Sequence, residues 1–515
     1  MKKKSSRRRI DVNVDELDRI IEAAMREPLS ETDGRTLRTA VHAMAERLVQ
    51  WRNTEKTSAV LEPKALPSGV DMPPEPEKQP PEGHGRHGAA AFTGANRVAV
   101  AHATLRSGDP CPECREGRVY RQKEPATLIR IVGQPPLEAK VFERERLRCN
   151  GCGEVFTASE PPSAGPEKFA ATAVVIIALL KYGTGMPFNR MERLEGQLGM
   201  PLPATTQWEL MEAAARLIQP VLDELIRQAA QGGVMHNDDT GMRILQMARS
   251  GDDGRTGTFT SGIVSICGGW KIALYFTGWK HAGENLADVL KQRAPGLAPP
   301  IQMCDALSRN TPKLRIDILL ANCNAHGRRQ FTEIAESFPE ECRHVLESQG
   351  AVYGFDAEAN ERGLTPEERL TFHQTHSAPV MEELHRWMEA QFAEHKTEPN
   401  SGLGKAISYL LRHWTKLTLF LRQQGAPLDN NVVERALKKA ILHRKNALFY
   451  KTMNGARVGD LFMSLIHTCE LNKVNPFDYL TELLRHPAEI RVRPGEWMPW
   501  HYRTTLAGTA TPAAA

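Results

Sequence analysis

Apolar positions near the start of the chain repeat at helical spacing. They follow one another at intervals of four, three, four and three residues, which places them on one face of a helix within residues 11–56. The positions are Leu37, Val41, Met44, Leu48 and Trp51. The stripe predicts a helix that packs on its own domain or pairs with a second copy as a short coiled coil. Two heptads are marginal alone, so the pattern leaves both arrangements open.

Two different patterns follow this helix. Residues 62–105 begin with a run of Pro, Gly and charged residues that cannot bury much apolar surface, which predicts a flexible linker. Residues 161–230 return to helical spacing, with a turn expected at 198–202 and a further helix from near Ala204. This rhythm is typical of a helix-turn-helix unit and also of a plain helical bundle.

Strand patterns begin after residue 232. The stretches VMHNDDTG, TFTSGIVSIC and WKIALYFTG are rich in β-branched and aromatic residues, and Gly268-Gly269 between the last two predicts a hairpin. An amphipathic helix, HAGENLADVLKQRA, precedes two more strands, PPIQMCDA and RIDILLANC. Residues 325–425 are mostly helical, and a last helix spans much of 427–450. This order predicts a multidomain α/β protein with a ribonuclease-H-like core and a long helical insertion.

Charge and composition narrow the class of protein. The net charge is +4, and the basic residues concentrate in MKKKSSRRRI at the start and in residues 434–451, which modestly favours a nucleic-acid partner. The most apolar run, AATAVVIIALL, is too short to cross a membrane, and no apolar signal core follows the basic start. Nine cysteines, four of them in paired motifs, fit a reducing compartment. We expect a cytoplasmic protein without a membrane segment.

Four cysteines form two CxxC motifs. CPEC contains Cys111 and Cys114, and CNGC contains Cys149 and Cys152. Each motif directs two thiolates at one tetrahedral ion, and two motifs close the site, so residues 106–160 predict a zinc ribbon with structural Zn²⁺. Arginines surround both motifs and favour DNA contact, although exposed arginines are common on any surface.

Three carboxylates fall on elements that the predicted core would bring together. Asp238 and Asp305 each stand at the end of a strand, and these two strands are neighbours at the centre of the expected sheet. Glu434 lies on the helix that would cross that sheet. Carboxylates that converge repel one another without a cation, and Mg²⁺ prefers oxygen ligands. The alternative is that Glu434 only pairs with Lys438 one helical turn later.

Five stretches in order resemble a family of mobile-element enzymes, the DDE transposases of the insertion-sequence-66 family. They are CPEC…CNGC, HNDDTGMRIL, CNAHGRRQF, PLDNNVVERALKKAILHRKNALF and FMSLIHTCELNKVNPFDYLTELL. The resemblance implies that Asp238, Asp305 and Glu434 bind catalytic Mg²⁺ or Mn²⁺. The family has Glu where this chain has Asp239, so either Asp238 or Asp239 can be the ligand, and strand alternation favours Asp238. The family's Tyr after the second aspartate is also missing.

The resemblance also implies a reaction and partners. The protein would bind terminal inverted repeats, cut DNA and join the freed 3′-OH to target DNA, as a homo-oligomer on DNA beside small accessory proteins. A catalytically silent DNA-binding repressor and a plain ribonuclease-H-like nuclease are the alternatives. Candidate phosphate contacts are Arg328, Arg329, Arg435, Lys438, Arg444 and Lys445. Cys323 and His326 form a CxxH pair, but two ligands do not close a tetrahedral site, which favours a structural role beside the active site.

The expected domain organisation has six parts. A zipper-like helical segment spans 1–61, the linker 62–105, the zinc ribbon 106–160 and the helix-turn-helix-like region 161–230. The catalytic domain spans 231–470 with its insertion at about 325–425, and a C-terminal helix and tail span 471–515.

Overall fold

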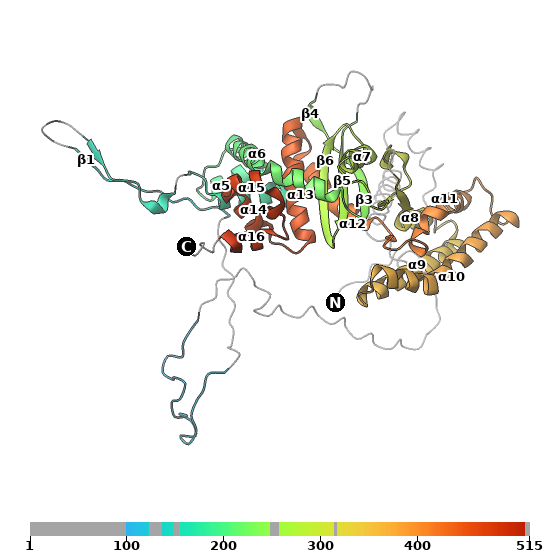
Figure 1. The fold of residues 1–515 in the computed structure, drawn as a ribbon, viewed down its shortest axis with the longest axis horizontal. Helices are drawn as coiled ribbons and strands as arrows, with labels where there is room; N and C mark the ends of the chain where they lie inside the picture. The colour runs from blue at the N-terminus through green and yellow to red at the C-terminus, as the bar shows by residue number, and fades with distance from the viewer. Residues whose placement is uncertain are drawn as a thin grey trace, which may run out of the picture. The chain divides into compact units, whose positions relative to one another are not determined.

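The computed structural model describes residues 99–122, 136–148, 150, 152, 155–165, 167–247, 257–313 and 317–509 (Figure 1). The predicted zipper-like helix and most of the predicted linker lie outside these residues. The chain divides into a small compact unit, which ends at Glu138, and a large unit, which contains everything from Ala139 onward.

The first CxxC motif is a tight turn of the small unit. The N–H of Cys111 donates to the carbonyl of Gly117 at 2.8 Å, and the N–H of Arg115 donates to the carbonyl of Cys111 at 2.9 Å. Hydrogen bonds from the backbone of Gly117 and Glu116 lower the pKa of the Cys114 thiol, as suits a metal ligand.

The second motif follows β1 (Arg146–Arg148), which pairs antiparallel with β2 (Val155–Thr157) in the large unit. Because Cys149 lies outside the described residues, the zinc site stays a prediction.

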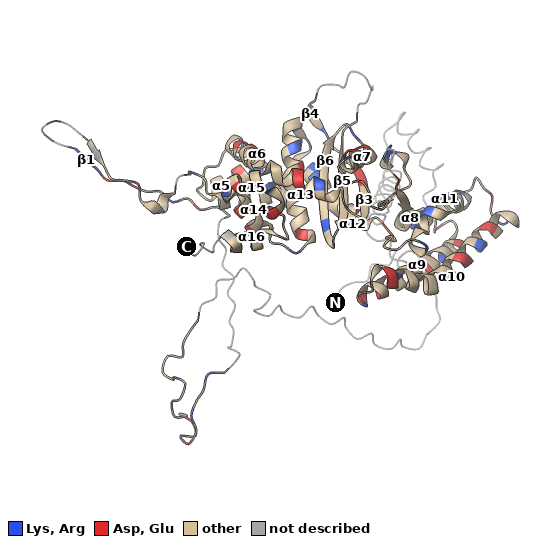
Figure 2. Cartoon of the chain, viewed as in Figure 1, with Lys and Arg blue, Asp and Glu red and all other residues tan. Residues whose placement is uncertain are grey.

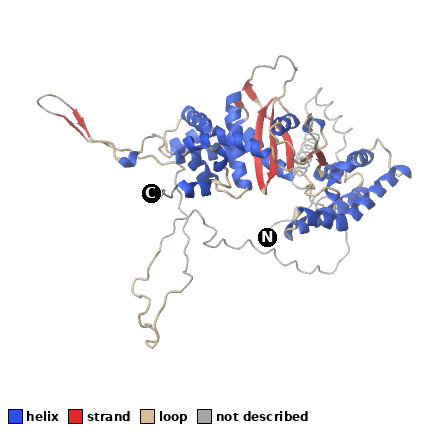
Figure 3. Cartoon of the chain, in the orientation of Figure 1, coloured by secondary structure: helices blue, strands red, loops and turns tan. Residues whose placement is uncertain are grey.

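A five-stranded mixed sheet forms the centre of the large unit (Figure 3). Its order is β6-β5-β3-β7-β8. The strands are β3 (Val234–Gly241), β5 (Phe259–Cys267), β6 (Trp270–Gly278), β7 (Ile301–Cys304) and β8 (Leu319–Asn322). The first three pair antiparallel, and β7 and β8 are parallel to β3. This mixed α/β arrangement is compatible with the predicted ribonuclease-H-like core.

The predicted hairpin between β5 and β6 is confirmed. Gly268 and Gly269 have φ of 57° and 87°, a region that costs glycine little. Helix α7 (Ala282–Leu290) follows β6 and packs against β3 and β5.

Helix α12 (Asn431–Ala447) packs on the centre of the sheet, against β3 and β5. Gly262 of β5 permits this close approach, because a Cβ there would lie 3.0 Å from Leu437 and 3.3 Å from Val433. Val433 and Leu437 are four residues apart, so they share one face of the helix. That face is buried, while Arg435 and Lys438 on the other side are exposed.

Helix α13 (Met453–Leu471) covers the open edge of the sheet at β6. An uncovered edge strand exposes unpaired N–H groups, which invite pairing with other chains. Every second N–H group of β6 instead donates to a polar side chain of α13 or of Asn472 just after it. The acceptor residues are spaced four apart along the chain. The pairs are Thr277 with Asp460, Tyr275 with Ser464, Ala273 with Thr468 and Lys271 with Asn472, at 2.6, 3.0, 3.0 and 3.1 Å.

The predicted helical insertion between β8 and α12 is confirmed. It consists of α8 (Asn324–Thr332), α9 (Pro339–Glu361), α10 (Pro366–Ala393) and α11 (Gly402–Leu417). These helices share an apolar core with β7 and β8, so the insertion is anchored to the parallel half of the sheet. Acidic and basic residues are interspersed along the outer surface of α9 and α10 (Figure 2).

Further helices flank the antiparallel half of the sheet. The N-terminal group is α4 (Ala171–Ala178), α5 (Phe188–Gln197) and α6 (Ala204–Ala229), and the C-terminal group is α14 (Pro476–Arg485), α15 (Pro487–Val492) and α16 (Tyr502–Thr509). The predicted turn before Ala204 is confirmed. Helix α6 also packs on α13 and β5, so it supports the core. Among the described residues, no helix has both the length and the apolar character that a bilayer span requires.

One short parallel sheet links distant parts of the large unit. Strand β4 (Ile244–Gln246), just after β3, pairs with β9 (Tyr450–Thr452), just after α12. Met242, Ile244, Tyr450 and Ala456 form a small apolar core around this pairing. The second sheet therefore fixes the end of α12 to the end of β3.

Candidate active site

Two predicted aspartates meet at the centre of the sheet. Asp238 lies on β3, and Asp305 directly follows β7, the parallel neighbour of β3. The two strands run parallel with His236 opposite Met303, and each aspartate comes two residues later, so both aspartates lie at the same level of the sheet. The prediction that these strands are central neighbours is therefore confirmed. The prediction that the first strand ends at Asp238 is wrong, because β3 continues to Gly241 in its pairing with β5, although its pairing with β7 stops at His236.

The side chain of Asn310 joins the two aspartates. Its Nδ2 donates to Asp305 Oδ1 at 2.6 Å and to Asp238 Oδ1 at 3.2 Å. Asn310 lies in a 3-10 turn, Ser308–Asn310, a few residues after β7. The partial positive charge of one amide group thus lies where two carboxylates converge.

Two buried amides hold Asn310 in place. Its main-chain carbonyl accepts hydrogen bonds from Asn237 Nδ2 and Gln302 Nε2, both at 2.7 Å. Gln302 Nε2 also donates to Asn237 Oδ1 at 2.7 Å. The Oδ1 atom of Asn310 is buried and has no hydrogen-bond partner. An unpaired buried oxygen costs about 1–3 kcal/mol, so the network supports a position that is unfavourable by itself.

Asp238 is difficult to ionise in this setting. Burial and the negative charges of Asp305 and Asp239 together raise the pKa of its carboxyl to about 6, against the lowering effect of a hydrogen bond from the Asp239 N–H. A buried carboxyl beside a second carboxyl gains strongly from a nearby cation.

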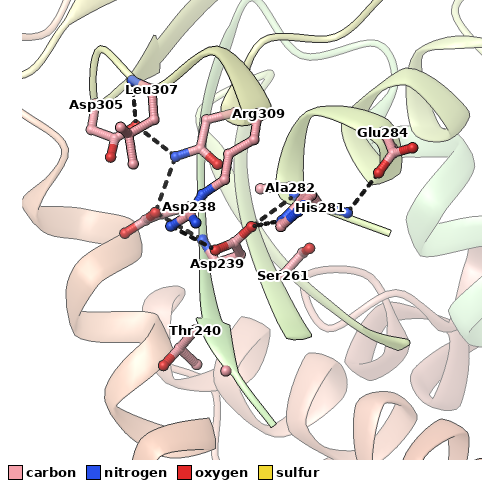
Figure 4. A network of polar contacts seen from close by, with 12 residues as sticks. Asp238, Asp239, Thr240, Ser261, His281, Ala282, Glu284, Asp305, Leu307 and Arg309 are labelled. Carbon is pink, nitrogen blue, oxygen red and sulfur yellow. Dashed lines mark hydrogen bonds and ion pairs between the residues drawn. The ribbon is translucent and has the colours of Figure 1, made fainter. Parts of the chain in front are cut away.

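The carboxylate of Asp239 has other partners. It lies 2.8 Å from His281 Nδ1 and 3.4 Å from a guanidinium nitrogen of Arg309, and its side chain is only 1% exposed (Figure 4). His281 is the residue just before α7, and its ring lies against Phe259. Asp239 therefore connects β3 to the start of α7 and to the turn that carries Asn310.

Glu434 lies in the first turn of α12, beside residues of the insertion. Its Oε1 is 3.6 Å from His326 Nδ1, and both atoms are buried without a hydrogen-bond partner. One ligand atom each of Glu434, His326 and Cys323 lie within 4.8 Å of one another. Within the described residues, the ion pair of Glu434 is with His326, not with Lys438. The charge of His326 also lowers the pKa of Asp238, so this histidine stands near both acids.

Asn430, which the sequence did not single out, anchors α12 to β3. Its Nδ2 donates to the carbonyl of Asn237 at 3.1 Å, and its Oδ1 lies 3.1 Å from His236 Nδ1. Its backbone N–H donates to Cys323 Sγ at 3.2 Å. Asn430 is the N-cap residue of α12, but its side chain makes no capping hydrogen bond, so the helix-capping preference of Asn does not predict these contacts. Asn310 had no signal in the sequence either, because its contacts depend on the path of a loop.

The basic residues proposed to bind DNA differ in their surroundings. Arg435, Lys438 and Lys445 are exposed on α12. Arg444 instead donates to Thr240 Oγ1 at 3.0 Å and to the carbonyl of Gly241, so it fastens α12 to β3. Arg328 is buried at the start of the insertion, with only 8% exposed.

Known proteins resemble this chain over most of its length. A family model described as "Transposase IS66 family" matches residues 168–458. The uncharacterized protein y4hP of Sinorhizobium fredii is 27% identical over 427 residues, which cover 78% of this chain and 75% of that protein. The uncharacterized protein y4jD of the same organism is 25% identical over 421 residues, 77% and 79% of the two chains. The matched region contains Asp238, Asp305 and Glu434.

Proposed function

Because the chain belongs to the transposase IS66 family, we propose that it binds the terminal inverted repeats of an insertion sequence, cuts DNA there and transfers the 3′-OH ends to target DNA. The observation that carries this proposal is the convergence of Asp238 and Asp305 on the Asn310 amide at the centre of the sheet. Glu434 on the helix packed against that sheet supplies the third acid.

The acids fit a divalent cation that prefers oxygen ligands. Asp238 and Asp305 point their Oδ1 atoms at one positive group, and the buried Oδ1 of Asn310 lacks a partner. Asp238, Asp305 and Glu434 would hold Mg²⁺ or Mn²⁺. Such ions activate a nucleophile and stabilise the leaving oxygen in phosphoryl transfer.

The neighbouring residues have supporting roles in this proposal. Asn237 and Gln302 hold the turn that carries Asn310, and Asn430 sets the position of α12 relative to β3. Asp239 is occupied by His281 and Arg309, which supports Asp238 as the ligand. Exposed basic residues of α12 would contact the DNA backbone.

DNA is the partner that the family implies, and the ends of the element are the proposed specific site. The zinc ribbon with Cys111, Cys114, Cys149 and Cys152 would contribute to end recognition, with Zn²⁺ in a structural role. We further propose a homo-oligomer on DNA, since two ends must be brought together, and accessory proteins of the same element. Such a reaction takes place in the cytoplasm, at the nucleoid.

Transposition in cells tests the proposal. A selectable marker is placed between the natural flanking sequences, and the wild type is compared with Glu434→Gln and with Glu383→Gln, a matched change at an exposed position on α10. We expect hops from the wild type and from Glu383→Gln, and none from Glu434→Gln. If Glu434→Gln transposes as often as the wild type, Glu434 is not the third metal ligand. End binding without hops in any variant, even with the accessory genes added, favours the silent DNA-binding protein.

A further inference from the structure

We propose that Cys323, His326 and Glu434 form a site for a transition-metal ion of the zinc class, separate in ligand chemistry from the aspartate pair. Thiol, imidazole and carboxylate are the three side-chain groups that bind Zn²⁺ in proteins. The ligand atoms of these residues lie within 4.8 Å of one another, which places them around one point. The sequence shows only the CxxH pair, because Glu434 is more than a hundred residues further along the chain.

The local structure explains why the CxxH spacing produces two ligands on one side. Cys323 is the N-cap of α8, and His326 is the third residue of that helix. Residues at these two positions face each other in the first turn of a helix, as they do in a capping box. The site is thus built from the start of α8 and the start of α12.

Hydrogen bonds fix the two helix starts relative to each other. Asn324 Nδ2 donates to the carbonyl of Leu428 at 3.0 Å, and the Asn430 N–H donates to Cys323 Sγ at 3.2 Å. Sulfur in this position keeps free lone pairs for an ion. Burial raises the pKa of the Cys323 thiol, so a metal ion would bind this sulfur by displacing the thiol proton.

The unpaired atoms at this site favour an ion there. His326 Nδ1 and Glu434 Oε1 are buried, face each other at 3.6 Å and have no hydrogen-bond partner. Ligand atoms stand about 2.0–2.3 Å from zinc. Two such atoms are therefore up to about 4 Å apart, so this pair already has a suitable separation. Three protein ligands leave the fourth tetrahedral position open, as in zinc sites that exchange ligands.

Because this site shares Glu434 with the proposed catalytic site, an ion bound here would affect the proposed reaction. A zinc-class ion on Cys323, His326 and Glu434 withdraws the third acid from Mg²⁺. We therefore infer that micromolar Zn²⁺ inhibits Mg²⁺-dependent cutting. The metal site itself does not depend on the proposed function, but this inhibition does.

Cobalt titration of the full-length protein tests the site directly. Co²⁺ binds like zinc, and its thiolate complexes absorb light in the near ultraviolet and visible ranges. The ribbon cysteines contribute equally in every variant, so the comparison is between wild type, Cys323→Ala and Cys342→Ala. Cys342 is a matched control, because it is also fully buried and belongs to the same apolar core. We expect Cys323→Ala alone to lose one Co²⁺ per chain and its charge-transfer band.

A second variant guards against misfolding of Cys323→Ala. His326→Gln keeps the sulfur and its hydrogen bond, and should bind this Co²⁺ about 100-fold more weakly, since even a residue behind a metal ligand contributes 10–100-fold to affinity. Circular dichroism melting checks that each variant is folded. Equal cobalt binding in all four proteins overturns the proposal.

The reaction provides a separate comparison. Asp305→Asn should lose DNA cutting but keep the Cys323-dependent cobalt band. If the band is present and the wild type does not cut DNA, the metal site stands and the proposed function fails. If the wild type cuts DNA but the cobalt band is absent, the proposed function stands and the metal site fails.

Discussion

Asp238 and Asp460 are two acids on or beside the central sheet, the first half-buried and the second buried, and their surroundings differ. Asp460 accepts hydrogen bonds from the N–H and the hydroxyl of Thr277, both at 2.6 Å. Asp238 shares the Asn310 amide with Asp305, a second carboxylate. Burial raises the pKa of both, to about 7 for Asp460 and to about 6 for Asp238.

The comparison separates a structural carboxyl from one suited to a metal ion. At the β6 edge, Asp460, Ser464, Thr468 and Asn472 each accept a hydrogen bond from a backbone N–H of β6, so the protein itself closes this edge. Within β3 and just after β7, Asp238 and Asp305 share one donor, the amide of Asn310, while the buried Oδ1 of Asn310 has no hydrogen-bond partner. Buried polar groups that the protein leaves incompletely paired are candidates for binding a ligand.

The largest expected effect is the loss of cutting on Asp238→Asn. The change removes a proposed metal ligand, and we expect single-turnover cleavage of end DNA to fall at least about 10³-fold, the scale for losing one group that stabilises transition-state charge. Stability should stay the same or rise, because a neutral amide replaces a crowded buried acid. Cleavage at the wild-type rate would mean that Asp238 is not a ligand.

The second prediction concerns the pH dependence of stability without divalent ions. The pKa of Asp238 rises from 3.8 to about 6 on folding, so the folded protein holds a proton that the unfolded chain releases. The stability linked to that proton is complete below pH 3.8 and is lost as the pH rises through about 6. The loss is on the order of 3 kcal/mol, from 1.36 kcal/mol per pKa unit.

Denaturant unfolding between pH 4 and pH 7 measures this loss, and Asp238→Asn should reduce it. Asp460 contributes in the same direction up to about pH 7, so some of the slope remains in that variant. Mg²⁺ should stabilise the wild type more at pH 7 than at pH 5. A slope that is identical in wild type and Asp238→Asn would contradict the raised pKa of Asp238.

The third prediction tests the closed edge. Asp460→Leu leaves the Thr277 N–H buried without an acceptor, which should cost about 2 kcal/mol of unfolding free energy. Ser464→Ala, one turn further along α13, removes a neutral acceptor and should cost about 1 kcal/mol. Denaturant unfolding measures both. Costs in the opposite order would show that the Asp460 hydrogen bonds do not outweigh its burial.

The fourth prediction concerns Asn310. Asn310→Ala removes the amide between the aspartates and leaves their elements in place, since the turn is held through its main chain. We expect about a tenfold increase in the Mg²⁺ concentration needed for half-maximal cutting, the lower end for residues that orient metal ligands. An unchanged Mg²⁺ requirement would limit Asn310 to a packing role.

The smallest effect is expected from Lys445→Ala. Lys445 is exposed, so the change should weaken binding to all DNA sequences and reduce the salt slope by about 1, without a change in melting temperature. Arg444→Ala, its neighbour, should lower the melting temperature because its guanidinium joins α12 to β3. If both variants behave alike, the division between DNA contact and internal support is wrong.

Much of the catalytic domain was predictable from local patterns. Alternating and continuous apolar runs marked all five strands of the sheet, Gly268-Gly269 marked the hairpin, and the order of elements placed Asp238 and Asp305 on neighbouring strands. The helix start near Ala204 and the helical insertion were also correct. These features depend on backbone preferences and on the side-chain period of a strand or helix, which a sequence displays directly.

The polar contacts around the site were not predictable in this way. Asn310 and Asp460 look like ordinary loop and helix residues, and Glu434 next to Lys438 looks like half of a surface ion pair. Asn430, for example, contacts Asn237 and His236, which lie 193 and 194 positions earlier in the chain. Such contacts depend on how elements pack, and spacing along the chain carries no record of it.

The sequence alone determined the elements, their order and the placement of Asp238 and Asp305 on or just after neighbouring strands, because propensity and periodicity are local properties. Only the tertiary structure decided that Asp239 contacts His281 and Arg309, and that Glu434 lies beside Cys323 and His326. The physical reason is that a carboxylate takes its role from the charges and donors around it. Those surroundings are created when distant segments are packed together and water is removed.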